Sequence, residues 1–439
     1  MTAVSRSQGR ELSGKWRCRS SRDRYYFEKQ MEVHVNEARF DAVLSRRDLV
    51  RIAGVGSAAV AAIRLGAGFE NAAAQDATPV TGMPPLPAGA TLIAGGLMGP
   101  RYIAIADDGT LYVSEAGAGG DEAVLAPAAP DATPTATAPL GTRGLTGQVT
   151  LIGVDGATSV VASGIASYNF EGPVGPAGIA LAGGKIWLAV GGAGPATAFV
   201  DPLPTENSVL SIDPATGEFT VVADIGANER TNNPEPFNVD SDLYGMDLGP
   251  DGLLYVADAG GNCVYTVDPA TGEITLVAVI PGIEIPAEMV PAGGNPERGG
   301  SSDIDPVPTS VAVAEDGTIY VSLLSGGPFP PGGAKIVKIA ADGTVTDHAL
   351  GLTMVTDVAF GPDGNLYAVQ LSTNFLLQTP DPGSVVRILA DGTFEPVVEG
   401  LLFPNGIAFD ADGNLFIAAG TVIPMGGMIL RVDGIAPAA

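Results

Sequence analysis

Histidine and cysteine are almost missing from this chain of 439 residues, which has two of each. His34 lies in a segment that we expect to be removed, and His348 lies in a predicted outer strand. A zinc centre held by His or Cys, and a Ser-His-Asp or Cys-His arrangement, are therefore excluded. Cys18 lies in the same removable segment. Cys263 would then stand alone, and one thiol cannot form an internal disulfide.

Basic residues are scarce outside the N-terminal region. Residues 1–74 hold 13 of the 22 basic but only 8 of the 49 acidic residues, which leaves 9 basic and 41 acidic residues, a net charge of −32, for the rest. A protein with this negative charge repels a phosphate backbone, which argues against nucleic acid as a partner. The acidity is typical of a soluble exported protein.

The N-terminal region has the features of an export signal. Arg46 and Arg47 belong to a segment, residues 45–51, that resembles the twin-arginine motif. The weakly apolar stretch that follows, residues 52–63, is too short to cross a bilayer, which takes roughly 20 residues. Three alanines ending at Ala74 form a small-residue cleavage site.

We therefore expect residues 1–74 to be an N-terminal extension and a twin-arginine signal peptide, cleaved after Ala74. Residues 75–89 would form a flexible linker before the folded part of the chain. The mature chain would be secreted or otherwise extracytoplasmic, with no integral membrane segment.

Aromatic residues make up only 6% of the chain, whereas Gly (60) and Pro (35) are abundant. This composition suits short strands joined by many turns and argues against a helical protein. One pattern occurs six times: a turn that ends in glycine, followed three residues later by an aromatic residue. The six aromatic residues are Tyr112, Trp187, Tyr255, Tyr320, Tyr367 and Phe416.

The spacing of these repeats predicts the fold. The six glycines are 75, 68, 65, 47 and 49 residues apart. A shortest period near 48 with strand patterning is typical of a β-propeller blade. We predict an all-β, six-bladed β-propeller with four-stranded blades over residues 90–435. The repeated aromatic residue is expected to fill the core between neighbouring blades.

The last blade appears in the sequence without its outer strand, because the chain ends soon after Val432. The folded part opens with an extra strand at residues 91–97, whose pattern matches the outer strands of other blades. We expect this N-terminal strand to close the last blade, which would remove two exposed sheet edges.

The connections between strands differ in length. The turns between the first and second strands, and between the third and fourth, are short and rich in Asp-Gly. The other connections are long, and strand alternation places them all on one face of the ring. They include residues 116–147, 191–207, 224–242, 279–306, 323–334 and 370–383. Loops on a rigid frame usually carry function, so we expect binding on this long-loop face.

Two rings of residues should line the mouth of the central channel there. The first ring, before each innermost strand, contains Arg101, Ala177, Tyr244, Thr309, Thr356 and Asn405. The second, at the end of each second strand, contains Glu115, Val190, Asp258, Leu323, Gln370 and Ala419. Arg101, Glu115 and Asp258 are the sharpest candidates for ligand contact. The alternative is that they bind loop backbone and one another.

A metal remains possible through carboxylates. Calcium prefers such oxygen ligands. The candidate ligands are Glu115, Asp240, Asp242 and Asp258. Residues 410–414 look like the start of a calcium loop, but equivalent turns recur in other blades and no terminal Glu follows. We interpret them as a hairpin.

The segment from residue 404 to 416 resembles gluconolactonase-type and NHL-type propeller repeats. In lactonases of that kind, a Glu, an Asn and an Asp before different innermost strands hold a divalent metal. The resemblance carries over to Asn405 alone, since the other first-ring positions of this chain hold different residues.

A closer resemblance is to the ScyD/ScyE family of exported propeller proteins, over roughly residues 90–433. The matching segments are residues 232–234, 240–245, 255–262, 307–310, 327–330 and 333–334. They include Tyr244, Asp258, Asn262 and Thr309 on the long-loop face. The resemblance implies no particular activity.

Our leading hypothesis is an exported, monomeric propeller of the ScyD/ScyE type that binds a small molecule or a protein without catalysis. The candidate binding residues are Arg101, Glu115, Tyr244, Asp258, Asn262, Thr309, Thr356 and Asn405. The alternative is a metal-dependent lactonase or related hydrolase that uses Glu115, Asp258 and Asn405. A third interpretation is a ring stabilised by calcium.

Overall fold

The computed structural model describes residues 85–124, 140–170, 172–192, 201–237, 239–290, 293–295, 298–374 and 381–437. The predicted signal at Arg46 and Arg47 and the cleavage site after Ala74 lie outside these residues, as does most of the expected linker. The division into extension, linker and propeller therefore stays a prediction. In the described part of the chain, none of the helices has the length and hydrophobicity of a membrane span.

Six antiparallel sheets form the blades of a propeller, as the repeats predict. From the innermost strand outwards, the first three are β2 (Pro100–Ile105), β3 (Leu111–Glu115), β5 (Gly141–Ile152) and β6 (Thr158–Asn169); β8 (Pro176–Ala182), β9 (Lys185–Val190), β10 (Ser208–Ile212) and β11 (Phe219–Asp224); and β12 (Leu243–Leu248), β13 (Leu254–Asp258), β14 (Cys263–Val267) and β15 (Ile274–Val279).

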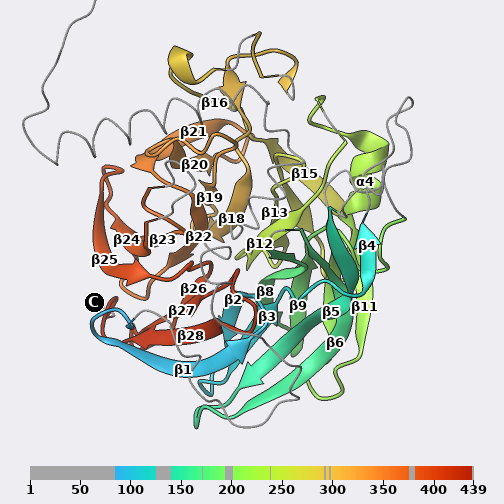
Figure 1. Ribbon diagram of the computed structural model, residues 1–439, viewed down its shortest axis with the longest axis vertical. Helices are drawn as coiled ribbons and strands as arrows, with labels where there is room; N and C mark the ends of the chain where they lie inside the picture. Colours follow the sequence, from blue (N-terminus) through green and yellow to red (C-terminus); the bar gives the residue numbers. More distant parts are fainter. Residues whose placement is uncertain are drawn as a thin grey trace, which may run out of the picture. The chain divides into compact units, whose positions relative to one another are not determined.

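The other three blades are β18 (Pro308–Val313), β19 (Ile319–Leu323), β20 (Ala334–Ile339) and β21 (Val345–Leu352); β22 (Val355–Phe360), β23 (Leu366–Gln370), β24 (Gly383–Ile388) and β25 (Phe394–Leu401); and β26 (Ile407–Phe409), β27 (Leu415–Ala419), β28 (Gly427–Val432) and β1 (Ala90–Leu97). Each innermost strand contacts the innermost strands of the two adjacent blades, so the blades close into a ring (Figure 1).

The first strand of the propeller completes the sixth blade, which confirms the predicted closure. β1 pairs antiparallel with β28, from Ala90 opposite Val432 to Leu97 opposite Gly427. In Figure 1 the blue β1 lies along the red β28. The two ends of the propeller are thus held in one sheet, and the outer edge of β28 is covered.

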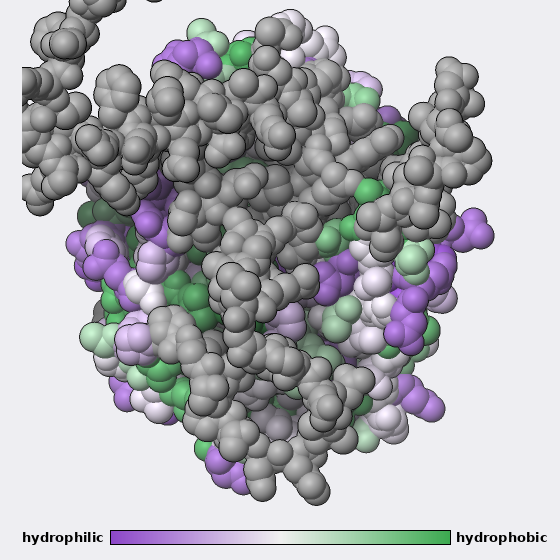
Figure 2. All heavy atoms as spheres, viewed as in Figure 1, coloured by the Kyte–Doolittle hydropathy of each residue, from purple (hydrophilic) through white to green (hydrophobic). Residues whose placement is uncertain are grey.

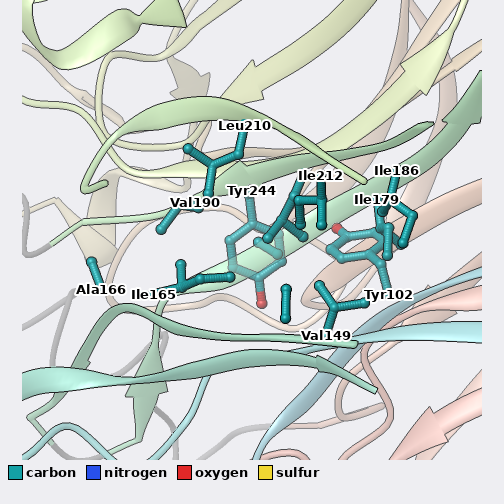
Figure 3. Close-up of a cluster of buried hydrophobic side chains, with 13 residues drawn as sticks. Tyr102, Val149, Ile165, Ala166, Ile179, Ile186, Val190, Leu210, Ile212 and Tyr244 are labelled. Atoms are coloured by element: carbon teal, nitrogen blue, oxygen red, sulfur yellow. The ribbon is translucent and has the colours of Figure 1, made fainter. Parts of the chain in front are cut away.

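Hydrophobic clusters fill the space between neighbouring blades. One of them joins Val149 and Ile165 of the first blade to Ile179 and Ile186 of the second, with Tyr244 of the third beside them (Figure 3). Equivalent clusters lie at the five other blade junctions. Each blade therefore shares its hydrophobic core with both neighbouring blades.

The repeated aromatic residues lie in these clusters, as predicted. Trp187, Tyr367 and Phe416 are buried, and the other three are partly buried against the same clusters. The Tyr320 ring stacks edge-on against Phe360 with 5.5 Å between centroids.

The short turns on the other face follow one plan. The Asp316 carboxylate accepts a hydrogen bond from Thr318 N at 2.9 Å, and Gly317 takes a φ of 83°, which costs glycine no steric clash. Gly217 allows close contact between blades, because a Cβ there would lie 2.0 Å from the carbonyl oxygen of Val161. The segment starting at Asp410 is a turn of this kind: its carboxylate accepts from Asp412 N and Asn414 N.

In the residues that the structure describes, the elements outside the four-stranded blades lie in the long connections. These are β4 (Glu122–Val124), β7 (Pro173–Val174), α4 (Ile225–Asn232), β16 (Ile283–Glu284), η2 (Ala287–Met289) and β17 (Asp303–Ile304). Because neighbouring strands in every blade are antiparallel, these connections leave the sheets at one rim. Around the outer edge of the molecule in Figure 2, hydrophilic and hydrophobic residues of the described part of the chain lie side by side.

Two strand predictions need correction. The outer strands of the first blade, expected over residues 148–152 and 159–162, extend to Gly141 and Asn169 as a long hairpin. Five of the six innermost strands begin two residues earlier than the sequence predicts, at Pro100 rather than Tyr102 in the first blade, for example, so that five first-ring residues lie inside strands. A register shift interrupts the pairing at each of these five positions.

Candidate binding site at the centre of the ring

The register shifts explain how the first-ring side chains are presented. In the first blade, the pairing of β2 with β3 shifts between Pro100 and Ile103, and Arg101 lies in that interval. Such a bulge adds a residue to one strand and re-aims its side chain. Arg101 thereby contacts residues of the third and sixth blades, which regular strand pairing would not bring to it.

Three of the predicted residues form a direct hydrogen-bonded group at the centre. Arg101 Nη1 donates to Tyr244 Oη at 2.5 Å and to Asn405 Oδ1 at 3.1 Å. Tyr244 Oη in turn donates to Asn405 Oδ1 at 2.5 Å. Arg101 Nη2 donates to the carbonyl oxygen of Pro173, and the guanidinium carbon lies 5.3 Å from the centre of the Tyr244 ring. All three side chains are buried.

The two threonines of the ring continue this network around the channel. Thr309 Oγ1 donates to the Val355 carbonyl, and Thr356 Oγ1 donates to the Asn405 carbonyl, each at 2.8 Å. Asn405 Nδ2 donates to the Arg101 carbonyl at 3.1 Å. These bonds link the fourth, fifth, sixth and first blades in sequence, so the ring residues hold the centre together.

Tyr102 is a member of this centre that the sequence did not single out. Its hydroxyl lies 2.7 Å from the carbonyl oxygen of Thr309 and 2.8 Å from that of Thr356. Its ring packs edge-on against Tyr244 with centroids 5.9 Å apart, in the cluster of Figure 3. A bulge lets two consecutive residues of β2, Arg101 and Tyr102, reach the centre together.

Glu115 of the second ring is bound within its own blade. Its carboxylate accepts hydrogen bonds from Met98 N at 2.5 Å, from Gln148 Nε2 at 2.8 Å and from Thr150 Oγ1. The residue is 1% exposed. Through these bonds Glu115 holds the loop before β2 against the end of β3.

Asp258 has a similar place in the third blade. Its carboxylate accepts from Ser241 Oγ and Asp242 N at 2.8 Å and from Gly261 N at 3.0 Å. Asn262 extends the arrangement, since its side chain donates to Asp305 Oδ1 at 3.0 Å and accepts from Val307 N at 3.2 Å. These bonds fasten the long loops on both sides of the third blade.

The candidate calcium ligands are not assembled into one site. Among the residues that the structure describes, no three His, Cys, Asp or Glu side chains come together in a way that could hold a metal. Glu115 belongs to the first blade, whereas Asp240, Asp242 and Asp258 belong to the third blade and the loop before it.

The divalent metal of the lactonase-type resemblance does not fit the centre either. Asn405, the one matching position, already receives two donors on Oδ1, from Arg101 and from Tyr244. The Arg101 guanidinium is a positive charge 3.1 Å from that oxygen, and it would repel a second cation there. Metal binding through Asn405 would require displacing a buried arginine.

An apolar cluster lies next to the polar centre. It consists of Leu324, Phe329, Met354, Leu371, Phe403 and Val422. Thr309, Thr356 and Asn405 are each preceded, two positions earlier in the chain, by a residue with a left-handed backbone conformation. These residues are Val307, Met354 and Phe403, with φ of 53°, 47° and 43°. This conformation costs roughly 1–2 kcal/mol per residue and concentrates at functional sites. A few polar groups beside apolar side chains are typical of small-molecule sites.

Burial changes the protonation of several carboxyl groups near the centre. It raises the pKa of Asp242 to about 8, and the negative charges of Asp240 and Asp258 add to the effect. It raises the pKa of Asp357 to about 7, although Ser310 Oγ and Ile407 N donate to this carboxylate. These groups therefore bind protons more tightly in the folded chain than in the unfolded chain.

The stabilisation that Asp242 and Asp357 contribute to the fold should therefore fall as the pH rises from 5 to 8. A carboxyl group whose pKa is higher in the folded chain than in the unfolded chain stabilises the fold fully at pH values below its unfolded pKa. This stabilisation is lost as the pH rises through the folded pKa. Asp357→Asn imitates the protonated form, so its unfolding free energy should decline less over this range, by on the order of 1–4 kcal/mol. Urea unfolding at pH 5, 6, 7 and 8 measures the difference.

Asp316→Asn is the matched control. Its carboxylate lies in an exposed turn, where the hydrogen bond from Thr318 N lowers its pKa, so it does not titrate between pH 5 and 8. Identical pH profiles for wild type and Asp357→Asn would show that Asp357 is ionised throughout, contrary to this assignment.

Part of the sequence matches a known family. The family model described as the SMP-30/Gluconolactonase/LRE-like region matches residues 352–433, which hold the fifth blade and the three inner strands of the sixth. No curated protein matches the sequence. The chain is thus a six-bladed propeller in which residues 352–433 are similar in sequence to this family.

Several solved structures resemble the fold. A putative oxidoreductase (glucose dehydrogenase) of Thermus thermophilus is 16% identical, covering 78% of this chain and 98% of that one, with a TM-score of 0.47. A gluconolactonase of Xanthomonas campestris is 12% identical, covering 79% and 89%, with a TM-score of 0.47. Virginiamycin B lyase of Staphylococcus aureus is 13% identical, covering 77% and 95%, with a TM-score of 0.41. At these identities the likeness concerns the fold alone.

Proposed function

We propose that this chain is an exported, monomeric propeller of the ScyD/ScyE type that binds a small molecule or a protein at its long-loop face without a divalent metal. The observation that carries the proposal is the bonding of Asn405 Oδ1 to both Arg101 and Tyr244. The guanidinium gives the centre a fixed positive charge, and the apolar cluster beside it supplies contact area.

Purified full-length protein tests this proposal. We expect no stoichiometric divalent metal by elemental analysis and no turnover in a screen of lactones and esters. Added calcium or a chelator should leave the melting temperature unchanged. Bound metal together with hydrolysis that is lost in Asp258→Ala would overturn the proposal, and a calcium-dependent melting temperature without turnover would favour the calcium-stabilised ring.

Export is supported by the sequence of the N-terminal region, with its twin arginines Arg46 and Arg47 and the alanines ending at Ala74. Residues 31–80 fused to a reporter should direct export that depends on the twin-arginine machinery. Retention of the fusion in the cytoplasm would remove this part of the proposal.

A second candidate function is a lactonase or related hydrolase. The family match over residues 352–433 favours it, because that region is gluconolactonase-like. The obstacle is the central chemistry described above: Glu115, Asp258 and Asn405 are each engaged by the chain's own donors. The hydrolysis screen distinguishes the two functions.

A further inference from the structure

We infer that the centre of the ring binds a small organic acid, whose carboxylate is held by the Arg101 guanidinium and the Thr421 hydroxyl. This inference rests on the proposed function and names the chemistry of its ligand.

The first reason is that the buried guanidinium of Arg101 has no carboxylate in direct contact with it among the described residues. The residue is 3% exposed, yet it makes no ion pair with any residue that the structure describes. Its partners are neutral: a tyrosine hydroxyl, an amide oxygen and a carbonyl oxygen. Taking a charge out of water is costly, so buried charges are normally paired.

The other arginines of the propeller show how unusual this is. Four of them form ion pairs: Arg143, Arg298, Arg387 and Arg431. Arg230 is exposed on α4. With 41 acidic and 9 basic residues after residue 74, a carboxylate partner could readily be supplied by the chain. Arg101 is the buried arginine in the described residues that lacks one.

The second reason is the unused donors of the guanidinium. Arginine has five N–H groups in a planar fork. Arg101 makes three hydrogen bonds, two from Nη1 and one from Nη2. One N–H on Nη2 and the one on Nε have no partner among the described residues. A guanidinium fork binds the two oxygens of a carboxylate in a planar, bidentate arrangement.

The third reason is a buried hydroxyl nearby. Thr421 is 1% exposed, and its Oγ1 has no hydrogen-bond partner in the described part of the chain. A Cβ placed on Gly99 would lie 2.6 Å from Pro173 Cγ and 3.2 Å from the Thr421 carbonyl. The segments that carry Thr421, Arg101 and its acceptor Pro173 therefore meet at Gly99. Leaving a buried hydroxyl without a partner is energetically costly, and a hydrogen bond to a ligand oxygen would remove that cost.

The neighbours of Thr421 indicate the rest of the ligand. Thr421 N donates to the Phe403 carbonyl at 3.3 Å, and Val422 follows it directly. Both neighbours belong to the apolar cluster beside the centre. The site therefore suits a carboxylate attached to an apolar body, rather than a free inorganic anion.

The test is titration of the full chain with benzoate and isovalerate, and with benzamide and isovaleramide as neutral analogues, at constant ionic strength. Calorimetry and thermal shift should show binding of the acids and not of the amides. Arg101→Gln should weaken acid binding by about tenfold or more, and Thr421→Val by about three- to tenfold. Arg387→Gln, which alters an exposed ion pair, should bind as wild type does.

Three results would overturn the inference: acids and amides that bind equally, acids that do not bind wild type, or acid binding that is unchanged in Thr421→Val and Arg101→Gln. If Arg101→Gln does not fold, Thr421→Val decides, because it keeps the side-chain volume and removes only the hydroxyl. If the acids do not bind, the proposed function still stands when the protein holds no divalent metal, hydrolyses no lactone or ester, and binds a neutral ligand or a protein.

Discussion

Deleting residues 86–96 should leave an insoluble or unfolded product. The deletion removes nearly all of β1, including Ala94, which is buried in the cluster between the sixth and first blades, and Ile93, which packs against that cluster. It would also expose the edge of β28 and open the ring at the junction that holds its two ends. Size-exclusion chromatography and circular dichroism melting measure the outcome, and we expect no cooperative unfolding transition.

A matched control lies on the same strand. Leu92 is 50% exposed, so Leu92→Ser should keep the fold and its melting transition. A synthetic peptide of residues 86–98, added during refolding of the deleted chain, should restore soluble protein by taking the place of β1. A deleted chain that stays soluble with an unchanged melting transition would refute closure by this strand.

Replacing Arg298 with methionine should destabilise the protein by about 3–5 kcal/mol. The Arg298 side chain is 7% exposed and pairs with Glu235 at 3.0 Å and with Asp305 and Asp303 at 3.1 Å. These bonds tie the loop before the third blade to the loop before the fourth. The substitution would leave buried carboxylates without their guanidinium, and urea unfolding at pH 7 should report the loss.

Arg387→Met is the control for this prediction. Its ion pair with Glu395 is partly open to solvent, with 35% and 45% of the two side chains accessible, so its loss should lower the free energy of unfolding far less than the loss of Arg298. Arg298→Lys should give an intermediate loss, because an ammonium keeps the charge but not the planar set of donors. Equal stabilities for Arg298→Met and Arg387→Met would show that the cluster contributes nothing beyond a surface pair.

The fold could be predicted because it is repeated in the sequence. Each glycine turn followed by an aromatic residue fixes the register of one strand, and six copies fix the number of blades. The same register places Glu115 and Asp258 at the last positions of β3 and β13, where the structure has them. The closing strand follows from counting strands in the last blade.

The long hairpin of the first blade could not be predicted in the same way. Gly141, Gly144 and Gly147 remove the alternation of apolar and polar side chains that marks a strand. Pairing with the segment that ends at Asn169, rather than residue type, makes Gly141–Gly147 extended. Local pattern carries no information about such pairing.

The contacts of the central site were also beyond the sequence. The ring positions could be predicted from the repeats, but the sequence of β2 contains no signal for the bulge that turns Arg101 and Tyr102 inward. Arg101 and Asn405 are 304 residues apart, and their hydrogen bond depends on ring closure. The partners of Arg298 likewise come from two loops that have no equivalent in the other repeats.

The most direct test of the central claim, that the Arg101 guanidinium takes the middle position of the ring in place of a divalent cation, is anomalous diffraction from crystals soaked in manganese. We expect density for the guanidinium against Tyr244 and Asn405 and no anomalous peak bonded to Asn405 Oδ1. A manganese peak on that oxygen, with Arg101 turned away, would contradict the account.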